Sequence, residues 1–368
     1  MPPAPSLATR VAAIAGTTLR AAAPAIDAGH YPVEILRELG AAGAFAAHLP
    51  PHGADFPAAI AATEAISREC GATGFLAWCQ DVCGLYLAES ANPALGGPLL
   101  AAHAAGQGFG GTALSNPMKA FAGIETFLLR AVRVPGGYRV NGALPWVSHI
   151  AEGQYCGAVA TVLDAEGARS HEVMFLLRFD GRARRRRCPA FAGMEGTSTW
   201  GVQLTDFAIG PEDIIADPAL PFIRRITAGF ILLQCGMALG IADASIAAMR
   251  GAEKSFGHVN AYLPDRPEVL APRLAALRAR VMRLAAHPFE TARAHLIDVL
   301  EARAEGAELA LCAAQSALLH QGARGYLSSD AAQRRLREAQ FVAIVTPAIK
   351  HLRWEIARLS REMNHAAA

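Results

Sequence analysis

The hydrophobic and polar positions follow three successive patterns along the chain. From residue 1 to 107, apolar residues recur at intervals of three and four, for example over 74–89, which places them on one face of a helix. From 108 to 218 the pattern changes to short runs rich in β-branched and aromatic residues. From 219 to 368 the helical spacing returns over long segments. The pattern therefore predicts an N-terminal helical domain, a middle β-domain and a C-terminal helical domain.

The middle region contains short apolar runs such as 126–134, 157–163 and 201–207, separated by Gly, Pro, Asn and Asp. Such runs are typical of strands joined by tight turns. Their length and spacing predict a small antiparallel β-domain, either a sandwich or a barrel.

The C-terminal region contains four long runs of helical spacing, joined by short loops: 222–251, 269–285, 292–320 and 329–365. Four helices of this length predict an antiparallel four-helix bundle. The predicted fold class is therefore α+β, mostly α.

One segment of the β-domain, 136–150, combines turn and strand signals with polar and aromatic side chains. We expect a turn at Asn141-Gly142, because this dipeptide fills the two positive-φ positions of a type I′ turn at low cost. Trp146 and Ser148 follow in a strand, where alternation places both on the same face. An aromatic plane beside a hydroxyl suits a flat polar cofactor, and it suits an ordinary β-core equally well.

Composition excludes several classes of protein. Of the 368 residues, 52% are hydrophobic and 18% charged, which argues against disorder, and the net charge of +2 gives no drive towards nucleic acid or anionic membrane. The N-terminus lacks the pattern of a secretory signal, and the longest apolar stretch, 228–242, contains Gln234 and three glycines and falls short of a membrane span. The seven cysteines are scattered without metal-ligand spacing, so we expect reduced thiols, no metal site and a cytoplasmic protein.

Seven local motifs occur in a fixed order along the chain. They are Leu49-Pro50, Ala113-Leu114-Ser115-Asn116-Pro117, Asn141-Gly142 running to Trp146-Val147-Ser148, Gly193-Met194-Glu195-Gly196-Thr197, Lys254-Ser255-Phe256-Gly257, Gly322-Ala323-Arg324-Gly325-Tyr326 and Arg337-Glu338-Ala339. Together with the three-part order, they resemble the acyl-CoA dehydrogenase flavoprotein superfamily over nearly the whole chain.

The resemblance implies an FAD site, or a site for reduced FAD or FMN, made by eight residues: Leu114, Ser115, Trp146, Val147, Ser148, Phe256, Gly322 and Gly325. By resemblance, Trp146 flanks the isoalloxazine ring and the Ser148 hydroxyl lies near flavin N5. Ser115 and the backbone of Leu114 hold the pyrimidine side. The last three residues approach the adenosine part from a neighbouring subunit, which implies a homo-oligomer, either a dimer or a tetramer.

The catalytic acid of the family is missing. Its dehydrogenases use a glutamate to remove the α-proton of an acyl thioester, and counting from Arg337 places Thr346 at that position. A second position that some members use is Phe230 here. A threonine hydroxyl is far too weak a base for this proton. A base recruited from elsewhere, such as Glu338 or Asp330, is the remaining candidate.

Three hypotheses for function follow from the resemblance. The first is an acyl-CoA dehydrogenase that oxidises an unusual thioester or similar CH–CH donor and passes electrons to an electron-transfer flavoprotein. The second is a flavin-dependent monooxygenase that receives reduced flavin from a separate flavin reductase and activates oxygen, which needs no α-proton base. The third is a non-catalytic homologue with a structural or regulatory role.

Overall fold

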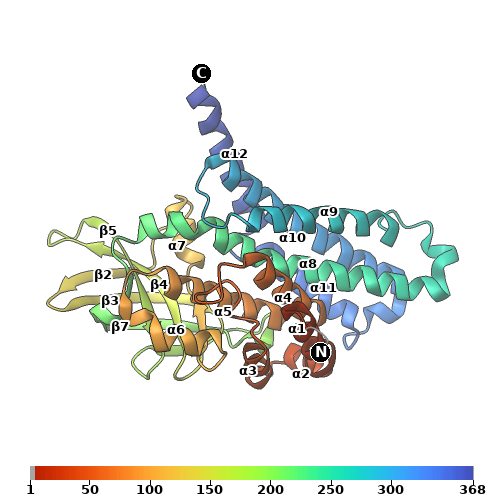
Figure 1. The fold of residues 1–368 in the computed structure, drawn as a ribbon, viewed down its shortest axis with the longest axis horizontal. Coiled ribbons are helices and arrows are strands. Elements are labelled where there is room, and N and C mark those ends of the chain that lie inside the picture. The colour runs from red at the N-terminus through yellow and green to blue at the C-terminus, as the bar shows by residue number, and fades with distance from the viewer. Residues whose placement is uncertain (1–4, 368) are drawn as a thin grey trace.

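The computed structural model describes residues 5–367. Its elements follow the predicted order: helices first, then a sheet, then long helices. Figure 1 shows the sheet at one end of the long axis, and the long helices extending from it to the other end. The predicted class, an α+β protein that is mostly α, is confirmed.

The N-terminal helices cover residues up to Ala104. Their bounds are α1 (Leu7–Ile14), the π-helical segment η1 (Ala15–Leu19), α2 (Arg20–Asp27), α3 (Val33–Ala41), α4 (Phe56–Glu69), α5 (Gly71–Glu89), the 3₁₀ turn η2 (Pro93–Leu95) and α6 (Gly97–Ala104). Proline usually ends a helix, but Pro24 lies inside α2. Ala23 and Ile26 on either side of it are fully buried, so packing outweighs the single backbone donor that proline lacks.

Helix α5 joins the helical part of the molecule to the sheet. Residues 71–87 are all buried, because α5 packs against α4, α8 and α11 on one side and against strands β1 and β4 on the other. A helix enclosed in this way is mostly apolar on every face, and Gln80 and Asp81 are polar exceptions that are buried with the rest. This central position lets α5 contribute side chains to a space between the sheet and the bundle.

The sheet has eight strands: β1 (Gly110–Thr112), β2 (Leu129–Val134), β3 (Gly137–Val147), β4 (Tyr155–Leu163), β5 (Arg169–Arg178), β6 (Arg184–Arg187), β7 (Trp200–Ile209) and β8 (Ile214–Ala216). Their order is β6-β7-β3-β2-β4-β5-β8, and β1 pairs with β4. The β1–β4 and β2–β4 pairs are parallel and the other pairs antiparallel. The short helix α7 (Ser115–Phe121) lies between β1 and β2 in the sequence.

The turn expected at Asn141-Gly142 is absent from this described part of the chain. Strand β3 continues through both residues, and the hairpin with β2 turns at Pro135 and Gly136 instead. Asn141 lies opposite a bulge in β7, where its side-chain oxygen accepts the Asp206 N–H at 2.8 Å. A Cβ at residue 142 would collide with the Leu128 carbonyl, so glycine is needed there for close strand approach rather than for a turn.

The C-terminal part consists of α8 (Ala219–Asn260), α9 (Pro267–Ala285), α10 (Arg293–Gln321), the 3₁₀ turn η5 (Gly322–Tyr326), α11 (Ala331–Ile344) and α12 (Ile349–Ala367). The single helix expected over 329–365 is wrong, because the chain breaks between α11 and α12. Pro347 has no N–H to donate and disfavours helical backbone at Thr346, so the helix cannot continue through it. By length and composition α8 could cross a membrane, but its most apolar window is 89% buried inside the protein.

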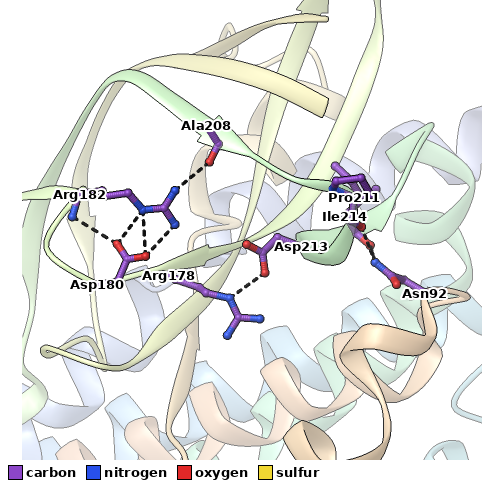
Figure 2. Close-up of polar contacts among 8 residues, drawn as sticks. All are labelled: Asn92, Arg178, Asp180, Arg182, Ala208, Pro211, Asp213 and Ile214. Carbon is purple, nitrogen blue, oxygen red and sulfur yellow. Dashed lines mark hydrogen bonds and ion pairs between the residues drawn. The ribbon is translucent and has the colours of Figure 1, made fainter. Parts of the chain in front are cut away.

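Polar contacts tie the end of α5 to the edge of the sheet (Figure 2). The Asn92 amide donates to the carbonyls of Pro211 and Ile214, each at 2.8 Å. Nearby, Arg178 donates to the Asp213 carboxylate at 2.7 Å. The Asn92 contacts hold the loop that follows α5 against the edge of the sheet at β8.

Candidate functional site

A cavity of about 500 Å³ lies between the sheet, α5, α7, α8 and the end of α11. Its wall is made by Phe75, Trp78, Thr112, Ser115, Lys119, Trp146, Ser148, Phe191, Ala192, Gly193, Met194, Thr197, Thr199, Phe230, Arg337, Gln340, Phe341, Ile344, Val345 and Thr346. These side chains come from all three parts of the chain, so the cavity exists only in the assembled fold.

Aromatic side chains form the helical wall of the cavity. Phe75 and Trp78, one turn apart on α5, stack with ring centroids 5.6 Å apart. Phe341 meets the edge of Phe75 at 4.7 Å, and Phe230 meets Trp78 at 5.3 Å. On the sheet side, Trp146 lines the cavity with 62% of its surface exposed. The cavity therefore offers apolar surface on two sides.

Three hydroxyl groups line the sheet side in a continuous chain. The Ser148 Oγ lies 2.7 Å from Thr199 Oγ1, which lies 2.8 Å from Thr197 Oγ1. The Thr197 hydroxyl donates to the Met194 carbonyl at 2.7 Å. Trp146 and Ser148 both face the cavity, as strand alternation predicted, while Val147 between them is buried in the core of the sheet.

A second hydroxyl pair closes the cavity on the side of α7. Ser115 Oγ at the start of α7 lies 2.8 Å from Thr346 Oγ1 in the break between α11 and α12. The Gln234 amide in α8 donates to the Thr346 carbonyl at 3.2 Å, which holds this break in place.

Behind the break, a fully buried arginine anchors the end of α11. Arg303 Nε donates to Gln234 Oε1 at 2.5 Å, and Nη2 donates to the Val342 carbonyl at 2.7 Å. Val342 lies in the last turn of α11, whose carbonyls lose their helical partners at the break, so the guanidinium satisfies one of them. Burial lowers the pKa of Arg303 to about 10, so it stays charged at neutral pH. This contact positions Thr346 on the cavity wall.

The charged groups on the wall are cations. Lys119 pairs with Glu125 at 2.6 Å and Arg337 with Asp27 at 2.6 Å, and neither of these carboxylates lines the cavity. Among the residues that the structure describes, those on the cavity wall include no Asp, Glu, His or Cys. The wall thus offers hydroxyls, an amide and two cations, but no side chain whose ordinary pKa suits removal of a C–H proton at neutral pH.

The predicted ring-binding residues fall into two groups. Ser115, Trp146 and Ser148 line the cavity. The side chains of Leu114 and Val147 are buried in the two hydrophobic cores and are not on the wall. The structure thus brings Ser115, Trp146 and Ser148 to one cavity, and their contact with a flavin ring stays a prediction.

Thr346 and Phe230, which the resemblance predicts to stand where the family carries its base, both lie on the cavity wall. The proposed substitutes do not. Asp330 caps α11 by accepting the Ala332 N–H at 2.8 Å. Glu338 is buried against Gly71 on the opposite side of α11, 3.4 Å from Arg334, and burial raises its pKa. The structure brings neither acid to the cavity.

The residues predicted to approach the adenosine part of a cofactor lie elsewhere. Phe256 is 48% exposed near the end of α8, and Gly322 and Gly325 lie in η5 after α10. None of the three lines the cavity of its own chain. Their contribution to a neighbouring subunit's site remains a prediction.

His149, next to Ser148, points away from the cavity. Its Nδ1 lies 2.9 Å from the Tyr31 hydroxyl and its Nε2 lies 3.3 Å from Gln80 Oε1. Burial lowers its pKa to about 3, so the ring is neutral. Its backbone N–H donates to the Thr197 carbonyl at 2.9 Å, so His149 ties the ends of the hydroxyl chain together.

Sequence reasoning missed several wall residues. The sequence pattern around Trp78 is that of an ordinary core residue, and in the structure Trp78 is both buried and on the wall. Thr197 and Thr199 belong to the run Thr197-Ser198-Thr199 directly before β7. Three adjacent hydroxyl side chains are a sequence signal that could have indicated a polar site. Lys119, Arg337 and Gln340 carry no signal of their own, because their positions depend on how α7 and α11 pack.

Comparisons with known proteins agree with the geometry. The family described as "Acyl-CoA dehydrogenase, N-terminal domain" matches residues 5–107. No curated protein sequence matches the chain.

Many solved structures share the whole fold. Butyryl-CoA dehydrogenase from Megasphaera elsdenii is 18% identical with a TM-score of 0.83, covering 97% of this chain and 99% of its own. Glutaryl-CoA dehydrogenase in complex with glutaryl-CoA is 19% identical with a TM-score of 0.85, covering 97% and 96%. Dibenzothiophene monooxygenase from Paenibacillus sp. A11-2 is 17% identical with a TM-score of 0.81, covering 98% and 97%. The resemblance to the acyl-CoA dehydrogenase superfamily is confirmed, and this fold serves both dehydrogenases and a monooxygenase.

Proposed function

We propose that this chain is a flavin-dependent monooxygenase with the acyl-CoA dehydrogenase fold, which binds reduced FMN or FAD supplied by a separate flavin reductase. The observation that carries this proposal is the cavity wall: it has the aromatic and hydroxyl groups that suit a flavin ring, and the wall residues described above include no acid or histidine.

The wall fits the isoalloxazine ring, which is flat and apolar on its faces and polar along its edge. Trp146 offers an exposed indole plane, and Ser148 and Ser115 offer hydroxyls at two separate points of the wall. Lys119 and Arg337 suit a ligand that carries negative charge, as reduced flavin and flavin phosphates do. A structure of the dibenzothiophene monooxygenase with bound FMN shares the fold with a TM-score of 0.81, which supports this assignment.

Dehydrogenation of a thioester needs a base at the α-carbon. At the family's usual position the wall presents Thr346, whose hydroxyl is already hydrogen-bonded to Ser115, and at the alternative position it presents Phe230. Neither can remove the proton, because general-base catalysis needs a pKa near the working pH. Oxygen insertion has no such requirement, so the same wall is compatible with it.

When bound, reduced flavin supplies the two electrons with which O₂ delivers one oxygen atom to a substrate and releases the other as water. The chain's own contribution is to hold the ring between Trp146 and the helical wall and to exclude water. Phe75, Trp78, Phe230 and Phe341 enclose the helical side with apolar surface. We therefore propose an apolar, aromatic small molecule as the substrate.

The experiment supplies the purified chain with chemically reduced FMN or FAD, ¹⁸O₂ and a panel of apolar aromatic heterocycles, and follows label incorporation by mass spectrometry. The proposal expects products that gain one labelled oxygen. As the opposing test, the flavin-loaded chain is mixed anaerobically with a panel of acyl-CoAs. Bleaching of the flavin band by any of them would establish a dehydrogenase and overturn the proposal, as would a chain that binds neither form of flavin.

A further inference from the structure

The three hydroxyls on the sheet side of the cavity have only one consistent arrangement of protons. A carbonyl oxygen can only accept, so the bond from Thr197 Oγ1 to the Met194 carbonyl uses the single proton of Thr197. The 2.8 Å contact between Thr197 and Thr199 must then be donated by Thr199. The 2.7 Å contact between Thr199 and Ser148 must in turn be donated by Ser148. Ser148 has therefore used its proton and can only accept a hydrogen bond from a ligand in the cavity.

The backbone around this chain of hydroxyls is held in an unusual shape. Met194 and Ser198 have left-handed φ values of 67° and 46°, flanking the 3₁₀ turn η3 (Glu195–Thr197). Non-glycine residues rarely adopt this conformation, and such strain concentrates at functional sites. The Ser198 hydroxyl donates to the Ile150 carbonyl at 2.7 Å, which anchors the turn against the segment that follows β3. Thr197 itself is buried, so water does not compete for its proton.

We propose that Thr197 and Thr199 are positioning residues that make Ser148 a hydrogen-bond acceptor, so that the cavity selects reduced over oxidised flavin. The identity of the ligand rests on the proposed function, and the contact of Ser148 with N5 on the family resemblance. Reduced flavin carries a hydrogen on N5 and can donate it to Ser148. Oxidised flavin has a bare N5 that can only accept, so two acceptors would face each other without a proton between them.

The preference follows from general hydrogen-bond energetics. A satisfied hydrogen bond strengthens binding by about fivefold, and a buried acceptor that faces no donor weakens binding by about five- to 150-fold. The difference between the two forms of flavin is therefore on the order of tenfold or more in affinity.

The test measures the dissociation constants of oxidised and reduced FMN under anaerobic conditions, and the ratio between them, for the wild type and variants. In Thr197→Val, Thr199 loses its acceptor and turns its proton to Ser148, so the Ser148 proton is free to face the cavity. We expect the preference for reduced flavin to fall by roughly tenfold. Thr199→Val frees the Ser148 proton directly and should shift the ratio in the same direction.

Ser198→Ala is the matched control. It removes a hydroxyl of the same turn that donates to Ile150 and not to the chain, so the ratio should stay at the wild-type value. A variant that merely destabilises the fold weakens both forms of flavin equally and leaves the ratio unchanged. If the wild type binds both forms and neither threonine variant changes the ratio, the inference is wrong while the proposed function stands. If the wild type binds neither form, both are wrong.

Discussion

His149 is placed so that it stays neutral in the folded protein, and this has a measurable effect on stability. The Gln154 amide donates to the Tyr31 oxygen at 3.0 Å, which leaves the Tyr31 proton free to donate to His149 Nδ1. Gln80 Oε1 can only accept, so His149 Nε2 carries the ring proton. Replacing His149 by Asn removes the titrating group, and Asn tolerates the left-handed φ of 61° at this position.

The size of the effect follows from the two pKa values. Burial lowers the pKa of His149 from 6.5 to about 3. As the pH falls below 6.5, the unfolded chain takes up a proton on this ring and the folded chain does not, so stability present above pH 6.5 is lost progressively towards pH 3. Between pH 7 and pH 5 the loss is about 2 kcal/mol.

The assay is urea unfolding at pH 7, 6 and 5, followed by tryptophan fluorescence and circular dichroism. At pH 7 we expect His149→Asn to be less stable than wild type by about 1–3 kcal/mol, because hydrogen bonds to Tyr31 and Gln80 are lost. Between pH 7 and pH 5 the wild type loses about 2 kcal/mol of its free energy of unfolding through His149, and the variant, which lacks this ring, does not. The gap between them should therefore narrow by about 2 kcal/mol.

The surface histidine His52 provides the control, because its exposed side chain has no buried partner to lose. His52→Asn should follow the wild type at every pH. A gap between wild type and His149→Asn that is the same at pH 7 and pH 5 would show that His149 protonates in the folded state, and would refute the reasoning.

Three further predictions concern the bundle and the cavity. Arg303→Ala leaves Gln234 Oε1 and the Val342 carbonyl buried without donors, so the free energy of unfolding measured in urea should fall by about 3–5 kcal/mol. Arg280 lies in a partly exposed ion-pair network, so Arg280→Ala should lower the free energy of unfolding by about 1 kcal/mol or less. Equal losses in the two variants would contradict the anchoring role of Arg303. Gly240→Ala should lower the melting temperature markedly, because a Cβ there would collide with the backbone of α4. Gly251 is on the same helix but faces open space, so Gly251→Ala should raise the free energy of unfolding by about 0.5–1 kcal/mol. Trp146→Ala should weaken binding of reduced FMN by about tenfold, because the indole plane offers contact area to the ring. The melting temperature should not change, because the indole is already exposed. An unchanged affinity would show that Trp146 does not contact the flavin.

The amino-acid sequence by itself determined the three-part order of the fold. Helical and strand periodicities are local properties, so the switch from spacing of three and four to short β-type runs marked the parts without tertiary information. Alternation along the segment predicted Trp146, at the end of β3, and Ser148, just after it, on one face, and both line the cavity. Counting along the helices predicted that Thr346 and Phe230 stand where the family carries its base, and both residues line the cavity.

Local signals failed where long-range contacts competed with them. Asn141-Gly142 favours a turn, but pairing of β3 with β2 and β7 on either side keeps the strand continuous through it. Pro24 favours a helix end, but the buried faces beside it keep the helix intact. At Pro347, by contrast, apolar periodicity on both sides predicted one helix, but proline has no N–H to donate to the Ala343 carbonyl and disfavours helical backbone at Thr346. The break leaves the Val342 carbonyl without its helical partner, and Arg303 donates to it instead.

The chemistry of the site was decided only by the tertiary structure. Which acids face the cavity depends on the rotation of α11 about its axis, which turns Glu338 towards Gly71 and Arg337 and Gln340 towards the cavity wall. The proton order of Ser148, Thr199 and Thr197 depends on one carbonyl, that of Met194, held by a left-handed turn. Spacing along the chain carries no information on such directions, because a hydrogen bond is set by where its donor and acceptor point in three dimensions.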